Sequence, residues 1–269
     1  MQYEERYAVH PDDAKGYDTE RLRKEFLIEK LFEPDDIRLV YSSYDRLIVG
    51  GVMPVKQVLE LTPIDPLKAP YFLHRRELGI INVGGKGVVC AGDIEFKLDY
   101  KEALYLGSGD RTITFRSEDA SAPALFYINS APAHRNYSDR KVTKADAVVA
   151  HMGSLEDSNE RTINKLIVTQ VLPTCQLQMG MTELKTGSVW NTMPAHTHNR
   201  RMEAYCRRRL PYVILWGNPS RPATSGCTTI RPCCPRRGRS IRPARRTIIR
   251  LSGEWPVKTS TTGIWIPVQ

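Results

Sequence analysis

The sequence predicts an all-β protein made of two β units in tandem, each about 100 residues long. Polar and apolar residues alternate over 94–99, 112–116 and 176–182, which is the two-residue period of a strand with one buried face. Gly-rich turn sequences separate these segments. Many short strands joined by such turns are typical of a sandwich or a barrel.

A short helix is expected before the strands begin, over residues 18–32. Asp18 or Thr19 suits the N-cap position, and Leu22 and Phe26 are four residues apart and so share one face. From about Ile37 onward the pattern is that of strands.

Turns and connectors are expected where glycine or polar residues cluster. Turns are predicted at Gly50-Gly51, Gly84-Gly85, 91–93 and 107–109. Residues 131–165 are polar and predict a connector with few strands. We therefore divide the chain into an N-terminal domain, 1–150, and a C-terminal domain, 151–269, whose last part, 206–269, has a different composition.

The net charge of +9 is concentrated in that last part. Residues 206–269 contain twelve Arg, one Lys and a single acid, whereas the other 205 residues contain 26 bases and 29 acids. They also contain eight of the eighteen prolines and four of the six cysteines. Such an asymmetry is typical of a basic interaction arm, so RNA binding by this tail is one alternative function.

The beginning of the chain predicts a soluble, cytoplasmic protein. It is polar and acidic, unlike the apolar core of a signal peptide, and no apolar run approaches the ~20 residues that span a bilayer. Without a secretory signal, a disulfide framework is not expected from the six cysteines.

His196, His198 and Glu203 form the motif that points to chemistry. Side chains two residues apart in a strand point to the same side, and Glu203 returns to the same cavity if the strand turns after Arg200. Imidazole and carboxylate ligands suit zinc, and also manganese, iron(II), cobalt or nickel. The adjacent Arg201 has the planar guanidinium that binds a substrate carboxylate.

Beyond this motif, the chain resembles the 5-keto-4-deoxyuronate isomerase (4-deoxy-L-threo-5-hexosulose-uronate ketol-isomerase) family over residues 17–205. The segments that carry the resemblance are 23–27, 45–51, Phe72-Leu-His-Arg-Arg-Glu-Leu-Gly79, 103–107, Ala131-Pro-Ala-His134, Arg161-Thr-Ile-Asn-Lys165, 174–177 and Trp190-Asn-Thr-Met-Pro-Ala-His-Thr-His198.

The resemblance implies a bicupin, which is two β-barrels in tandem, assembled as a homohexamer. It implies one zinc ion per subunit, bound by His196, His198 and Glu203 and by a fourth histidine that this chain lacks. The implied reaction moves a carbonyl from C1 to C2 of the uronate, yielding 3-deoxy-D-glycero-2,5-hexodiulosonate in pectin breakdown. Arg161 and Arg201 are the expected ligands of the substrate carboxylate, and no general base is assigned.

After Tyr205 the family pattern stops, and the region of the missing histidine reads Gly238-Arg-Ser-Ile-Arg-Pro243. We interpret residues 206–269 as a frame-shifted reading of a GC-rich gene, the alternative being an evolved basic tail. The second barrel is then expected to be incomplete, and zinc binding and activity weak or absent. A metal-free cupin that binds a sugar acid without converting it is the other alternative function.

Overall fold

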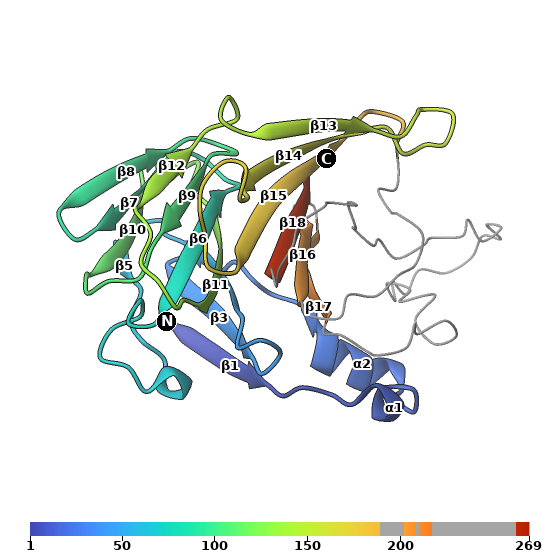
Figure 1. Ribbon diagram of the computed structural model, residues 1–269, viewed down its shortest axis with the longest axis horizontal. Coiled ribbons are helices and arrows are strands. Elements are labelled where there is room, and N and C mark those ends of the chain that lie inside the picture. Colours follow the sequence, from blue (N-terminus) through green and yellow to red (C-terminus); the bar gives the residue numbers. More distant parts are fainter. Residues whose placement is uncertain (189–201, 208–209, 217–261, 269) are drawn as a thin grey trace.

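A computed structural model describes residues 1–188, 202–207, 210–216 and 262–268. In these residues three β-sheets are stacked as layers, with two short helices at one end (Figure 1). The prediction of an all-β fold is therefore confirmed. None of the helices in this part of the chain has the length and apolar character required to span a membrane.

The N-terminal half of the chain forms the central sheet and the outer sheet. The central sheet has the order β1 (Gln2–Arg6), β3 (Asp36–Ser42), β4 (Ile48–Met53), β11 (Phe126–Pro132), β6 (Arg76–Asn82), β9 (Ala103–Leu106) and β12 (Arg140–Val142). The outer sheet has the order β5 (Leu59–Glu60), β10 (Ile113–Ser117), β7 (Gly87–Ala91) and β8 (Ile94–Leu98).

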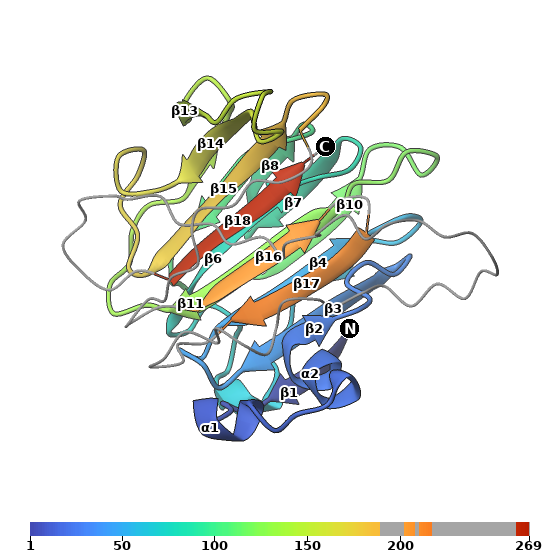
Figure 2. The same ribbon diagram turned by 90° about the vertical axis from the view of Figure 1, so that its right-hand side faces the viewer.

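The third layer, here named the C-terminal sheet, faces the viewer in Figure 2. Its order is β13 (Val148–Met152), β14 (Arg161–Ile167), β15 (Leu177–Leu184), β18 (Thr262–Val268), β16 (Glu203–Arg207), β17 (Leu210–Trp216) and β2 (Leu27–Ile28). Strand β18 pairs in parallel with both β15 and β16, and β2 pairs antiparallel with β17. The N-terminal segment thus contributes the last strand of this sheet. The domain boundary at 150/151 stays a prediction.

The central sheet is buried on both faces because it packs between the other two. One face meets the outer sheet in a core that includes Leu78, Ile80, Phe115 and Phe126. The other face meets the C-terminal sheet in a core that includes Met179. Every residue of β6 is buried as a result, which matches the continuous burial of a strand covered on both sides.

Glycines in the central sheet permit this close packing. Gly50 and Gly51, predicted as a turn, lie inside β4, so that prediction is wrong. A Cβ on Gly50 would come within 2.8 Å of the carbonyl oxygen of Arg38 on the paired strand. A Cβ on Gly79 would overlap with the sulfur of Met179 in the C-terminal sheet. These glycines serve close approach between neighbouring elements rather than chain reversal.

The predicted helix is present but shorter than expected. Helix α2 spans Thr19–Phe26, and Asp18 is its N-cap, whose Oδ1 accepts a hydrogen bond of 2.8 Å from the amide of Arg21. The helix ends at Phe26 because Leu27 and Ile28 continue as β2 and pair with β17. The other helices are α1 (Pro11–Ala14) and a 3-10 turn at Asp65–Leu67.

Residues 131–165 contain more strand than predicted. Strands β12 and β13, the first part of β14 and the end of β11 all lie in this range. Their polar composition misled the prediction because β12 and β13 are edge strands with exposed residues. Edge position also explains Ile94 in β8, which is 56% exposed although the alternation predicted a buried face.

Candidate functional site

The two faces of the C-terminal sheet differ in chemistry. Met179 and Met181 of β15 point into the core shared with the central sheet. Because successive side chains of a strand alternate, Gln178 and Thr182 project from the opposite face. Lys165 pairs with Gly180, and paired residues share a face, so Lys165 projects from that opposite face as well.

Glu203 belongs to the same face. Met202, Ala204 and Cys206 lie in the core shared with the central sheet, so Glu203, between them on β16, points away from it. Its side chain is buried, at 7% exposure. We name the set Arg161, Lys165, Gln178, Thr182 and Glu203 the polar face of the C-terminal sheet.

Burial makes the polar face unusual. Arg161 and Lys165 are each 3% exposed, and Thr182 is fully buried. Charged side chains are almost never this buried unless a partner compensates for the lost hydration. Burial lowers the pKa of Lys165 and also the pKa of Arg161. A buried face that carries two cations favours an anionic ligand.

Two atoms of the polar face have hydrogen-bonding capacity to spare. The Oγ1 of Thr182 and the Nε of Arg161 are buried, and neither has a hydrogen-bond partner among the residues that the structure describes. Part of Arg161 is engaged locally, since its Nη1 donates a hydrogen bond of 2.9 Å to the carbonyl oxygen of Asn159. Buried polar atoms of this kind require an explanation, and a bound ligand is one.

The predicted metal motif is described only at Glu203. His196 and His198 lie outside the described residues, as does Arg201, so their roles stay predictions. Within the residues that are described, no three His, Cys, Asp or Glu side chains group closely enough to hold a metal ion. Of the predicted ligands, Glu203 alone is described, and its buried carboxylate is a ligand type that divalent cations accept.

Strand register shows how far the two cations of this face are from Glu203. Gln178 and Glu203 both pair with Gly263, so they lie at one level of the sheet. Lys165 pairs with Gly180, two residues from that level, whereas Arg161 pairs with Leu184, six residues away. At ~3.4 Å per residue, Arg161 lies about 20 Å along the strands from the level of Glu203, and Lys165 about 7 Å.

Glu77 connects the central sheet to the segment that enters β15. Its Oε1 accepts hydrogen bonds from the amides of Gln176 and Leu177 at 2.6 and 2.7 Å. Its Oε2 accepts from the amide of Cys175 at 2.8 Å and from the hydroxyl of Tyr105 at 2.7 Å. A fully buried carboxylate thus has four donors and holds the start of β15 against the first unit.

Arg76 precedes Glu77 and points to the other face of the central sheet. Its guanidinium donates to the Oγ and carbonyl oxygen of Ser130 at 2.9 and 2.6 Å, and to the carbonyl oxygen of Arg46 at 2.7 Å. Burial lowers the pKa of Arg76 to about 9. Arg76 and Glu77, both within the family-like segment 72–79, thus hold neighbouring segments of the chain together.

Ion pairs join strand β15 to the N-terminal part of the chain, residues 1–150. Glu183 of β15 pairs with Lys101 and, at 3.1 Å, with Lys144, and it accepts a hydrogen bond of 2.8 Å from Asn164. Burial raises the pKa of Glu183, but the hydrogen bonds and charges of the two lysines outweigh it and lower the pKa overall.

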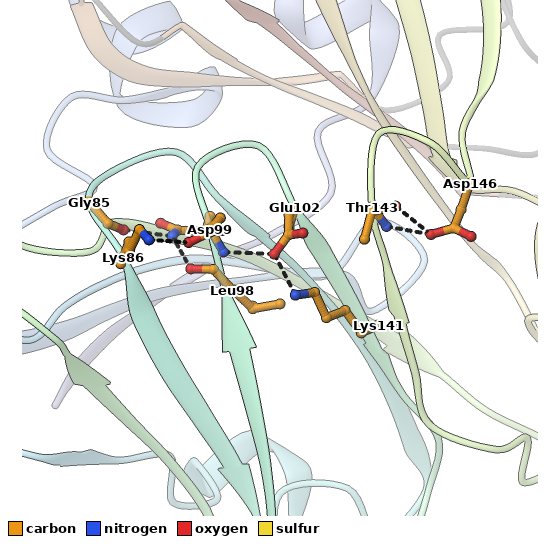
Figure 3. A network of polar contacts seen from close by, with 9 residues as sticks. Gly85, Lys86, Leu98, Asp99, Glu102, Lys141, Thr143 and Asp146 are labelled. Atoms are coloured by element: carbon orange, nitrogen blue, oxygen red, sulfur yellow. Dashed lines mark hydrogen bonds and ion pairs between the residues drawn. The ribbon is translucent and has the colours of Figure 1, made fainter.

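A neighbouring polar network fixes the chain between β8 and β13 (Figure 3). The Oε2 of Glu102 lies 2.7 Å from Lys141 Nζ and accepts from the amide of Asp99 at 2.8 Å. Asp146 accepts from the amide and hydroxyl of Thr143 at 2.8 and 2.7 Å. These contacts hold the connector in place and lie apart from the polar face.

Three of the four histidines outside the motif have local partners. His10 caps α1 through Nδ1, which accepts a hydrogen bond of 3.2 Å from the amide of Asp12. His74 lies edge-on to Tyr71, with ring centroids 5.0 Å apart. His151 contacts the hydroxyl of Thr162 at 3.1 Å.

Sequence reasoning missed Lys165, Gln178 and Thr182 as site residues. The signal was present, because the alternation over 176–182 already separated Gln178 and Thr182 from the methionines. The sequence does not say which face of this strand is the apolar core. The packing of the methionines against the central sheet answers that question.

Comparison with known proteins adds independent information. A family model described as "KduI/IolB family" matches residues 28–210. A 4-deoxy-L-threo-5-hexosulose-uronate ketol-isomerase of Bacteroides thetaiotaomicron is 71% identical over 209 residues, which is 78% of this chain and 75% of that protein. The ketol-isomerase of the same name from Bacteroides fragilis is 70% identical over the same shares, and that of Formosa agariphila is 56% identical.

The family match covers the central sheet apart from β1, and it covers the polar face as far as β16. Relatives this similar are named isomerases, and the chain is accordingly an isomerase by descent. The resemblance in the segments quoted from the sequence is thus confirmed, and the chain belongs to the KduI/IolB family.

Proposed function

We propose that this chain is a zinc-dependent ketol-isomerase. Its reaction converts 5-keto-4-deoxyuronate to 3-deoxy-D-glycero-2,5-hexodiulosonate in pectin degradation. The observation that carries the proposal is the 71% identity to a relative named for this uronate over 209 residues, together with a family match over 28–210 that includes the whole polar face. An aldose–ketose isomerisation needs a protected site, because its enediol-like state reacts with water and with stray protons.

The polar face offers the environment that this reaction requires. Burial of Thr182, Lys165 and Glu203 keeps water from the substrate and strengthens electrostatic interactions with it. A zinc ion bound by His196, His198 and Glu203 would supply Lewis-acid polarisation of the substrate oxygens. Arg201 is proposed to bind the substrate carboxylate, since Arg161, the other expected ligand, lies about 20 Å along the strands from the level of Glu203. The general base is left unassigned.

We further propose that the tail lowers the activity of this particular chain. The sequence after Tyr205 departs from the family pattern and lacks the fourth histidine that the resemblance implies. Losing one of four ligands weakens zinc binding, because the remaining three must hold the ion with an added water. The homohexamer, the second cupin barrel and the cytoplasmic location likewise belong to this proposal.

The test compares two full-length proteins, this chain and a repaired chain in which residues after Tyr205 follow the family sequence. Zinc content is measured by atomic emission, and turnover on the product of unsaturated-uronate breakdown is followed by chromatography. The repaired chain is expected to hold one zinc per subunit and to turn over, and this chain to do neither well.

Two outcomes contradict parts of the proposal. A repaired chain that holds zinc but does not isomerise the uronate contradicts the reaction and favours a non-catalytic cupin. One tight zinc and normal turnover in this chain contradict the effect assigned to the tail. The gene sequence around codon 205 tests the frameshift itself, which requires an alternative frame encoding the missing histidine.

A further inference from the structure

Three of the segments that carry the family resemblance meet at one junction, where the chain enters β15. These segments are 72–79, 131–134 and 174–177. The third segment is bonded to both of the others. Its amides donate three hydrogen bonds to Glu77, and the Nε2 of Gln176 donates to the carbonyl oxygen of Pro132 at 3.0 Å.

The junction holds β15 beside the level of Glu203. Leu177, whose amide donates to Glu77, is the first residue of β15, and Gln178 follows it on the polar face. Gln178 and Glu203 both pair with Gly263. The contact with Glu77 therefore lies one residue, or ~3.4 Å, along the strand from the row that contains the predicted metal ligand.

A second carboxylate holds the other end of β15, but with less control over that row. Glu183 pairs with Lys101 and Lys144, and it lies five residues from the row, which is about 17 Å along the strand. Its two partners are ammonium groups on flexible stems. Glu77 instead binds backbone amides, which cannot move unless the strand moves with them.

A carboxylate is the side chain that satisfies this junction. Each oxygen of Glu77 accepts two hydrogen bonds, three of them from amides and one from the hydroxyl of Tyr105. A carboxamide has a single acceptor oxygen and would present its own donors to the rest. Because Glu77 is fully buried, bulk water cannot replace the lost contacts, and the start of β15 has to shift to find new ones.

We propose that Glu77 is a positioning residue of the isomerase site, which fixes β15 along its axis so that Gln178 stands level with Glu203 on the polar face. The inference rests on the proposed function, which supplies the reaction that needs this alignment. A displacement of about 1 Å among groups that bind one substrate can cost ~100-fold in rate, even when its cause lies outside the site.

Methionine methyl groups report the alignment in the full-length chain. Met179 and Met202 are the sequence neighbours of the two aligned residues, and both lie in the core shared with the central sheet. In 13C-methyl-methionine spectra, Glu77→Gln is expected to move both resonances. Glu183→Gln, the matched control at the other end of β15, is expected to leave Met202 in place. The inference is overturned if Met202 does not move in Glu77→Gln, or moves equally in both variants.

Binding of D-galacturonate, an acidic sugar, tests the consequence for the site. Calorimetry on the full-length chain is expected to show about tenfold weaker binding in Glu77→Gln, the effect of one lost hydrogen bond to the ligand. Glu183→Gln should bind as the unmodified chain does. Phe115→Ala, which leaves a cavity in the other core, should do so as well and separates alignment from stability. Unchanged binding in Glu77→Gln, or equal weakening in all three variants, overturns the inference.

Hydrogen exchange in the unmodified chain does not depend on the folding of Glu77→Gln. Because coupling between two sites is reciprocal, the bound sugar acid should slow exchange at the amides of Gln176 and Leu177. The amide of Thr143, which donates to Asp146, is the control and should be unaffected. Equal slowing at Thr143, or no slowing at 176–177, overturns the inference.

The outcomes also separate this inference from the proposed function. A sugar acid that does not bind the unmodified chain contradicts the proposed function, and the methionine resonances then decide the role of Glu77 by themselves. Sugar-acid binding combined with an unmoved Met202 in Glu77→Gln contradicts the role of Glu77 alone.

Discussion

The two β units bury different kinds of surface. Between the central and outer sheets, the core consists of apolar side chains such as Phe115 and Phe126, whose ring centroids lie 5.4 Å apart. The C-terminal sheet is apolar only where it meets the central sheet, and its other face buries Lys165, Thr182 and Glu203. The first unit engages its buried charges, Arg76 and Glu77, in hydrogen bonds, and the second buries a polar face where a ligand is expected to bind.

The largest effect is expected in the first unit. Phe115→Ala should lower the free energy of unfolding by about 3–5 kcal/mol, because it leaves a cavity beside Phe126. Chemical denaturation measures the loss. A variant that loses ligand binding without losing stability would contradict the assignment of stability to the first unit and of ligand binding to the second.

Glu77→Gln tests the connection between them. The carboxamide has one acceptor oxygen in place of two, so at least one of the buried amide donors from 175–177 loses its partner. We expect a loss of about 3 kcal/mol, the size of a broken buried charge interaction, and faster hydrogen exchange at residues 175–177.

Tyr105→Phe is the matched control for Glu77→Gln. It removes a single donor to Glu77 and should cost about 1 kcal/mol. If the two variants lose equal stability, the amide contacts of Glu77 are not what holds the start of β15.

Glu183→Gln tests the ion pairs with Lys101 and Lys144. The folded-state pKa of Glu183 lies below its ordinary value of 4.5, so its contribution is present above pH 4.5 and is lost as the pH falls through the folded-state pKa. The variant should lose about 1 kcal/mol at pH 7 and show a flatter decline of stability below pH 4.5. Equal slopes for both proteins between pH 5 and pH 2 would contradict this assignment.

The smallest effect on stability, with opposite sign, is expected at Thr182. Thr182→Val replaces a buried hydroxyl that has no partner in the described part of the chain, so stability should be unchanged or rise by up to about 1 kcal/mol. Binding of D-galacturonate should weaken at the same time. Thr162→Val, whose hydroxyl contacts His151, is the control and should lose stability slightly without affecting binding.

Sequence patterns predicted the class of fold and part of the site. Alternation identified β10 and β15, and Asp18 identified the start of α2, because these signals are local. The Gly50-Gly51 pair was misread because glycine serves both turns and close packing, and only the neighbouring Arg38 and Leu31 distinguish the two. Glu203 was proposed as a ligand because of its spacing from the two histidines. Since the histidines lie outside the described residues, the metal stays a prediction.

The sequence by itself determined the all-β class, the family and the candidate ligands, since each depends on residue types at fixed spacing along the chain. Tertiary structure decided which face of β15 is core and which is polar, and hence that Lys165, Thr182 and Glu203 share a surface. Alternation divides a strand into two faces but does not say which one another sheet will cover. That choice is made by packing between segments as distant as Gly79 and Met179, whose close contact assigns one side of β15 to the apolar core.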